Sequence, residues 1–290
     1  MIKTVWESLG SESLWRETLA LRIAVAACFI GHGLIAIQVS ANYGSEWSYW
    51  IRSILPSAIE YEASKNLLRI IGIIDILDGI CLLLPRIPKQ ALAWVLGWGF
   101  LTALSRLFFL GVYVPPYEVN GFHAASEFIK RTPNWVLPLL LVAATSPGLG
   151  FSDSIRKNKY KILTLTVAAQ TVAIFLNNSY EYQSPFFEFE LIKVGMPQWY
   201  FWMVTCLSIF SFLMLILIYL QNKRSILISV VGATVTLLVY TMAEGFSVYA
   251  RNLPGGFFYA LIRFVSHMSM YTCMILWFSE TLQRSRKDFR

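Results

Sequence analysis

The chain has 290 residues, of which 56% are hydrophobic and only 14% are charged, and its mean hydropathy is +0.56. Soluble domains have about 25% charged residues, so this composition excludes an ordinary soluble globular protein and indicates a polytopic membrane protein. The net charge of +7 comes from dispersed basic residues rather than from one patch, which argues against nucleic acid as a partner.

Apolar segments of membrane-spanning character recur along the whole chain. They predict transmembrane helices at residues 18–39, 66–85, 91–114, 135–149, 162–178, 200–220, 226–244 and 257–282. The fourth segment is short and contains Pro138, and the basic run 156–161 separates it from the fifth, so we expect two helices there. The predicted fold class is therefore all-α, a polytopic membrane bundle of about eight transmembrane helices.

The basic residues predict an orientation in the membrane. More than half of the 24 Lys and Arg residues lie in the N-terminus, in the turns after the second, fourth and sixth segments, and in the C-terminus. Short cytoplasmic segments are enriched in Lys and Arg, so we expect a multi-pass protein of the cell (inner) membrane with both termini in the cytoplasm. Glu7, Glu12 and Glu17 precede the first apolar segment, so no cleavable signal is expected.

The connections between the segments suggest two tandem four-helix units, at residues 1–150 and 151–290. Each unit has a tight basic inner turn, PRIPKQ in the first and QNKRS in the second, and Gly97 and Gly232 fall at similar places in the third and seventh segments. Four spans is an even number, so the two units would have the same orientation and form a parallel repeat.

An acidic pair lies near the middle of the second apolar segment, NLLRIIGIIDILDGICLLLP. Asp75 and Asp78 are three residues apart and therefore share one face of a helix. Ionisable groups at bilayer depth are costly, usually face the interior of a bundle, and often mark function. The alternative is a structural ion pair of Asp75 with Arg69 or Arg106 that locks the second and third spans together.

Several basic side chains lie within the spans, on the outer side of the bilayer midplane. At about 1.5 Å of rise per residue, this group comprises His32, Arg69, Arg106, Arg263 and His267. If they converge, they form a polar pocket that opens outward, with Asp75 at its floor and Asp78 deeper on the cytoplasmic side.

Such a pocket would suit a quinone, whose carbonyl oxygens need hydrogen-bond partners and whose reduction needs a proton route. On this hypothesis the catalytic residues are Asp75, His32 and Arg106, and the ligand-binding residues are Arg69, Asp78, Arg263 and His267. The arginines could instead hold an anionic lipid headgroup or substrate.

We predict no metal site. His32 and His267 could ligate a haem, but single histidines in a bundle are more often hydrogen-bonded, so haem is not expected. His123 and Glu127 are four apart in GFHAASEFIK, which predicts an amphipathic helix on the outer surface with a solvated pair rather than a metal site.

The first half of the chain has a pattern of residues found in one family. The first span has the tripeptide GHG at 31–33, and the second has Gly72, Asp75 and Gly79 in the spacing G-x-x-D-x-x-x-G. Over residues 17–147 this resembles the DoxX/DoxD-like family of four-helix membrane proteins, in which an acidic residue, usually Glu, lies between two glycines of the second helix. The resemblance implies that Asp75 takes this position. One branch of the family is the small subunit of a thiosulfate:quinone oxidoreductase, which implies an association with membrane redox enzymes.

We therefore expect an integral membrane accessory or quinone-linked subunit of a redox or electron-transfer assembly, with the bilayer and other membrane subunits as partners. One alternative is a non-catalytic structural or lipid-binding subunit, and another is a small-molecule transporter. A transporter would have helices interrupted at mid-span, whereas the prolines here cluster at span ends apart from Pro138.

The sequence has no Walker, HExxH or GxSxG motif, and its four cysteines form no CxxC pair. Enzyme and accessory subunit both remain open, and co-purification in mild detergent would separate them.

Overall fold

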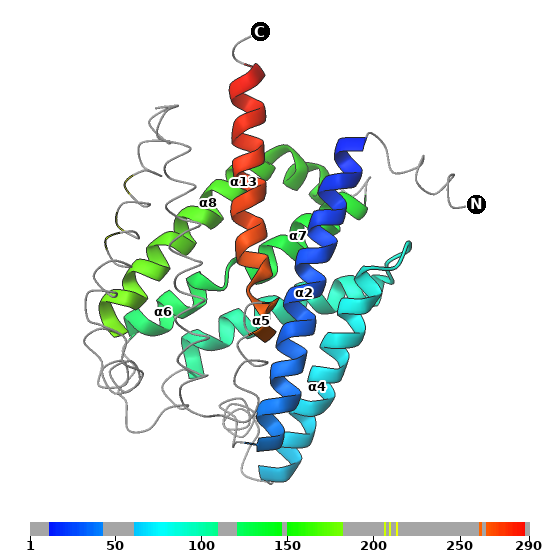
Figure 1. The fold of residues 1–290 in the computed structure, drawn as a ribbon, viewed down its shortest axis with the longest axis vertical. Helices are drawn as coiled ribbons and strands as arrows, with labels where there is room; N and C mark the ends of the chain where they lie inside the picture. Colours follow the sequence, from blue (N-terminus) through cyan, green and yellow to red (C-terminus); the bar gives the residue numbers. More distant parts are fainter. Residues whose placement is uncertain are drawn as a thin grey trace.

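The computed structural model describes residues 12–42, 61–109, 121–146, 150–181, 261–262 and 265–287, together with the single helical residues 206, 209 and 213. Within these ranges every regular element is a helix, in agreement with the predicted all-α class (Figure 1). The helices are α2 (Glu12–Asn42), α4 (Tyr61–Leu82), α5 (Lys89–Phe109), α6 (Gly121–Lys130), α7 (Pro133–Thr145), α8 (Gly150–Glu181) and α13 (Met268–Lys287).

Proline sets several of the helix boundaries. α4 ends before Pro85, and α5 begins directly after Pro88, because proline has no backbone N–H and disfavours helical geometry in the residue before it. α7 begins at Pro133, in the first helical turn, where the missing N–H costs nothing.

Six of the predicted spans have a counterpart among the described helices, with two differences. The basic run 156–161 lies inside α8, which begins at Gly150 and has Asp153 in its first turn, so the break between the fourth and fifth spans lies before this run. The predicted span 257–282 is interrupted by a turn at His267. The predicted spans 200–220 and 226–244, and with them Gly232, lie outside the described residues except for the three single positions.

α2 and α4 pack closely because glycines remove the side chains from their interface. They run antiparallel, since Gly33 of α2 lies against Gly72 of α4, and Ile30, one turn earlier on α2, lies against Gly79, further along α4 (Figure 1). A Cβ on Gly33 would lie 2.5 Å from the carbonyl oxygen of Gly72. Small residues that let helix backbones approach in this way are typical of membrane helix pairs.

α13 packs between α2 and α8 at the centre of the described helices (Figure 1). It is antiparallel to α8, because Trp277 Nε1 donates to Thr164 Oγ1 at 3.0 Å and Lys159 forms an ion pair with Glu280. Trp277 is fully buried in the hydrophobic core, which α2, α4, α5, α7, α8 and α13 build together. Helices of the two predicted units, 1–150 and 151–290, thus share one core.

Arg22, in the N-terminal third of α2, fixes this helix to the turn after α4, because its Nη1 donates to the carbonyl oxygen of Leu84 at 2.8 Å. This bond satisfies a carbonyl group just beyond the helix end, where no intrahelical donor is available. The start of α2 and the end of α13 lie toward the same end of the described helices (Figure 1).

We expect Arg22→Gln to lower the free energy of unfolding by about 1 kcal/mol, because the shorter side chain loses the bond to Leu84. The measurement is denaturant unfolding of the purified chain in detergent. Arg86→Gln is the matched control, since Arg86 is an exposed arginine in the same turn. Equal stability of the two variants would contradict the role assigned to Arg22.

The outward face of α4 is aliphatic from Leu67 to Ile80, and Leu83 and Leu84 of the following turn continue it. The exposed side chains include Ile70 at 54% and Leu77 at 56%, and the set comprises Leu67, Ile70, Ile73, Leu77, Ile80, Leu83 and Leu84. At 1.5 Å per residue this face is roughly 25 Å long, which is close to the thickness of a bilayer's hydrocarbon core.

Among the described helices, α2 alone has a segment long and apolar enough to cross a membrane, Thr18–Ile37, with a mean hydropathy of 2.0. α4 has three charged residues within its apolar run, Arg69, Asp75 and Asp78. α7 has 13 residues and is therefore only about 20 Å long.

Candidate functional site: a polar pocket between α2, α4 and α5

A cavity of about 70 Å³ lies between α2, α4, α5 and the turn that joins α6 to α7. This is space for on the order of five water molecules. Its walls are formed by Cys28, Phe29, His32, Ile35, Ala36, Leu68, Ile71, Asp75, Trp98, Gly99, Thr102, Arg106, Arg131 and Asn134. The structure thus brings together the three residues predicted as catalytic, Asp75, His32 and Arg106.

Each helix contributes a single stripe of side chains to the pocket. On α5, Trp98, Thr102 and Arg106 follow one another at intervals of four residues, which places them on one face. On α2, Cys28 and His32 have the same spacing. The polar groups therefore converge because three helix faces meet.

Asp75 is the most buried charged residue of the pocket, with 4% of its surface exposed. Its Oδ1 accepts a hydrogen bond of 2.7 Å from Nε1 of Trp94, which stacks on Trp98 with a centroid distance of 5.5 Å. A buried carboxylate needs such a donor because its desolvation is otherwise uncompensated. The hydrogen bonds that the structure describes for Asp75 thus come from the indoles of Trp94 and Trp98.

The ion pair that the sequence suggested as an alternative is not formed among the described residues. Arg69 Nη1 donates instead to Asn66 Oδ1 on its own helix, at 3.1 Å and exposed to solvent. Arg106 lines the same pocket as Asp75 without an ion pair between them. Arg69 lies six residues before Asp75 and therefore projects from a different face of α4.

His32 is held between two close helix contacts. A Cβ on Gly31 would lie 2.6 Å from the backbone nitrogen of Ser266, next to α13, and Gly33 contacts α4 as described above. The His32 Nδ1 lies 2.8 Å from the carbonyl oxygen of Cys28. Because a carbonyl can only accept, Nδ1 must be protonated, and in the neutral ring Nε2 is then the acceptor.

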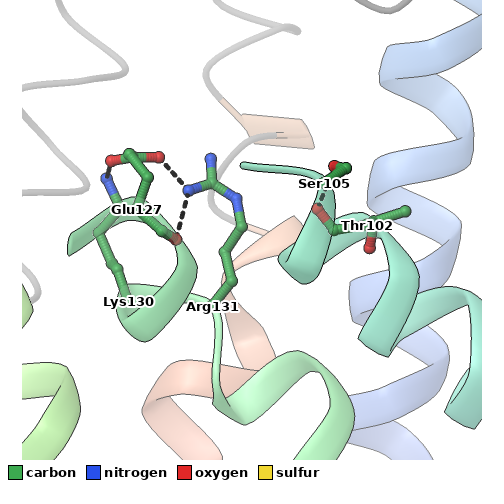
Figure 2. A network of polar contacts seen from close by, with 5 residues as sticks. All are labelled: Thr102, Ser105, Glu127, Lys130 and Arg131. Atoms are coloured by element: carbon green, nitrogen blue, oxygen red, sulfur yellow. Dashed lines mark hydrogen bonds and ion pairs between the residues drawn. The ribbon is translucent and has the colours of Figure 1, made fainter. Parts of the chain in front are cut away.

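Arg131 reaches the pocket from the junction of α6 and α7 (Figure 2). Its Nη1 donates to the Glu127 carboxylate and, at 3.1 Å, to the Glu127 backbone oxygen, while Lys130 Nζ bonds the other carboxylate oxygen. Glu127 is only 6% exposed. The predicted solvated Glu127 on an outer-surface helix is therefore wrong, because α6 packs on α5 and α8 and buries this side chain. The His123 side chain lies outside the described residues.

Of the remaining predicted ligand-binding residues, the three that the structure describes do not line the pocket. Arg69 and Asp78 lie on α4 outside its wall, and both are only partly buried. His267 is buried at the turn before α13. Arg263 lies outside the described residues.

Sequence reasoning missed Trp94, Trp98, Arg131 and Asn134. The four-residue spacing of Trp94, Trp98, Thr102 and Arg106 is a signal that could have identified the α5 stripe. No sequence signal pointed to Asn134, because its position depends on how α7 packs against α13. In the fold, Ser269 Oγ of α13 donates to Asn134 Oδ1 at 2.6 Å. Within the described part of the chain, no group of three or more His, Cys, Asp or Glu side chains could hold a metal ion.

Comparison with known proteins gives no family for this chain. No protein-family model matches its sequence, and no curated protein and no solved structure is significantly similar to it. The resemblance to DoxX-like proteins rests on the motif residues themselves, above all Gly72, Asp75 and Gly79.

Proposed function

We propose that this chain is a multi-pass, DoxX-like membrane subunit that holds a quinone headgroup in the pocket and works within a membrane redox assembly. The observation on which the proposal rests is the convergence of His32, Asp75 and Arg106 around a cavity whose other walls are mostly apolar. Apolar walls with a few converging polar groups are typical of small-molecule sites.

The surface pattern favours a membrane location. α4 exposes a continuous aliphatic face while Asp75, Glu127 and Lys130 are buried, which inverts the usual arrangement of a soluble protein. The predicted inner turns lie at the starts of α5 and α8, where Lys89 and the basic run 156–161 are found. On this proposal about eight spans cross the membrane, and the basic end faces the cytoplasm.

The pocket chemistry suits a quinone ring. Arg106 and Arg131 offer N–H donors for carbonyl oxygens, and Trp98 offers a flat apolar wall. His32 and Asp75 are groups that can accept and release a proton within the same cavity. An isoprenoid tail would extend from the cavity between the helices.

The close contact of α2 and α4 gives the DoxX-like motif a physical meaning. Gly72 and Gly79 lie where α4 touches α2, and Asp75 lies between them. The two glycines thus let the acidic side chain approach α2 at the depth of His32. An acid between two glycines is the feature on which the resemblance is based.

The test is a titration of the purified chain in lipid nanodiscs with a short-chain benzoquinone, followed by quenching of tryptophan fluorescence. We expect saturable quenching, and about tenfold weaker binding in Trp98→Leu, because the ring loses its stacking surface. Trp135→Leu is the control, since Trp135 packs on Phe100 and does not line the pocket. Quenching that rises linearly with quinone concentration, without saturation, would refute quinone binding.

A further inference from the structure

The planar guanidinium group of Arg131 has one edge that forms hydrogen bonds and a second edge that forms none to a described protein atom. Within the residues that the structure describes, its Nη1 makes all of its side-chain hydrogen bonds, both of them to Glu127 (Figure 2). The Nε and Nη2 groups donate to no described protein atom, and the residue lines the pocket. These two groups form the planar edge that binds two oxygen atoms at once in arginine–carboxylate and arginine–phosphate pairs.

The position of this guanidinium is fixed before any ligand binds. Glu127 holds the side chain, and the turn holds the backbone, since Arg131 N donates to Phe128 O at 3.1 Å and Asn134 N donates to Arg131 O at 2.9 Å. A pre-positioned group loses little conformational entropy on binding, so its contribution to affinity is larger than that of a mobile surface arginine.

We propose that Arg131 binds an oxyanionic group of the pocket's ligand, a carboxylate or a phosphate, and that Glu127 is the positioning residue that orients Arg131 for it. Lys130 and Arg131 carry two positive charges against the one negative charge of Glu127, so an oxyanion in the cavity that Arg131 lines would compensate the remaining charge. The ligand therefore has an anionic end in addition to any ring. This inference does not depend on quinone binding, because a quinone headgroup is neutral.

The first experiment compares benzoate with benzamide, two ligands of the same shape that differ in charge. Thermal unfolding of the full chain in zwitterionic nanodiscs measures binding of each. We expect the wild type to prefer benzoate at least tenfold, and Arg131→Gln to abolish this preference while binding benzamide normally. Arg131→Lys should keep only part of the preference, since an ammonium cannot form the two-point contact. Arg156→Gln is the matched control, because Arg156 forms the same kind of intrahelical ion pair, with Asp153, on the surface of α8.

Variants of Glu127 test whether this residue acts by orienting the Arg131 side chain or only through its negative charge. Glu127→Gln still has an oxygen that accepts from Arg131 and should retain the benzoate preference, whereas Glu127→Leu should lose it severalfold. If charge alone mattered, removing the carboxylate would increase the preference in both variants, and that result would overturn the role of Glu127.

The second experiment identifies the source of the oxyanion. Native mass spectrometry of the chain from nanodiscs containing phosphatidylglycerol or phosphatidylcholine shows whether a phosphate headgroup is retained in an Arg131-dependent way. An Arg131-dependent preference in either experiment confirms the inference and shows whether the ligand is a small carboxylate or a lipid. The inference is overturned if the wild type shows neither preference, or if Arg131→Gln and the folded Arg131→Lys variant both keep them. Loss of quinone quenching with the anion preference intact would refute only the proposed function.

Discussion

Asp75→Asn is expected to fold like the wild type and to bind the quinone in its reduced, hydroquinone form roughly 10- to 100-fold more weakly. The reason is that a hydroquinone O–H can donate to the Asp75 carboxylate, and hydrogen bonds to a charged group contribute about 1.5–3 kcal/mol. Folding should be retained since the asparagine oxygen can still accept the hydrogen bond that Trp94 Nε1 donates to Asp75. The measurement is the same fluorescence titration in nanodiscs, with circular dichroism as the test of folding.

Asp78→Asn is the matched control for this prediction. Asp78 lies on the same helix, one turn away, but does not line the pocket, so its replacement should leave quinone affinity unchanged. A folded Asp75→Asn variant with wild-type affinity would mean that the carboxylate has a structural role only. Equal losses in both variants would place the ligand elsewhere on α4.

Gly33→Ala should lower the free energy of unfolding by about 1–3 kcal/mol, because the added methyl group overpacks a tight interface. The new Cβ would lie 2.5 Å from the Gly72 carbonyl oxygen and 2.8 Å from Cγ1 of Ile76. A backbone oxygen cannot move aside by itself, so α2 and α4 must separate. Unfolding in detergent, followed by circular dichroism, measures the loss.

Gly97→Ala provides the control for Gly33→Ala. A Cβ on Gly97 meets no atom within 4 Å, so this substitution should be neutral or should stabilise α5 by up to about 1 kcal/mol. Because Gly33 is next to His32 and its contact lies beside Asp75, Gly33→Ala should also weaken ligand binding. Equal stability of the two variants would show that the α2–α4 interface can relax.

The sequence predicted three of the residues that line the cavity. The lengths of the apolar runs predict helices at α2, α4 and α5, and the rise per residue places His32 and Arg106 roughly 6–9 Å above Asp75. These three residues line one cavity. Height along a helix is a local property, so it follows from position in the chain.

The rotation of each helix about its axis was decided by tertiary packing. Asp75 and Arg106 lie in the same cavity, yet Asp75 accepts its bond from Trp94, because the close glycine contact between α2 and α4 orients α4. Position along the helices could not tell whether Trp94, Arg69 or Arg106 is the partner of Asp75.

The environment of the α6–α7 junction also depended on tertiary structure. In the sequence, Glu127 lies in a short amphipathic segment whose polar face would ordinarily meet water. In the fold, α5 and α8 cover α6, and Glu127 is buried with Lys130 and Arg131. Periodicity shows which residues share a helix face. What that face contacts is determined by how α5 and α8 pack on it. For that reason the sequence by itself determined the helices and the position of each polar residue along them, while only the packing decided which of these residues meet.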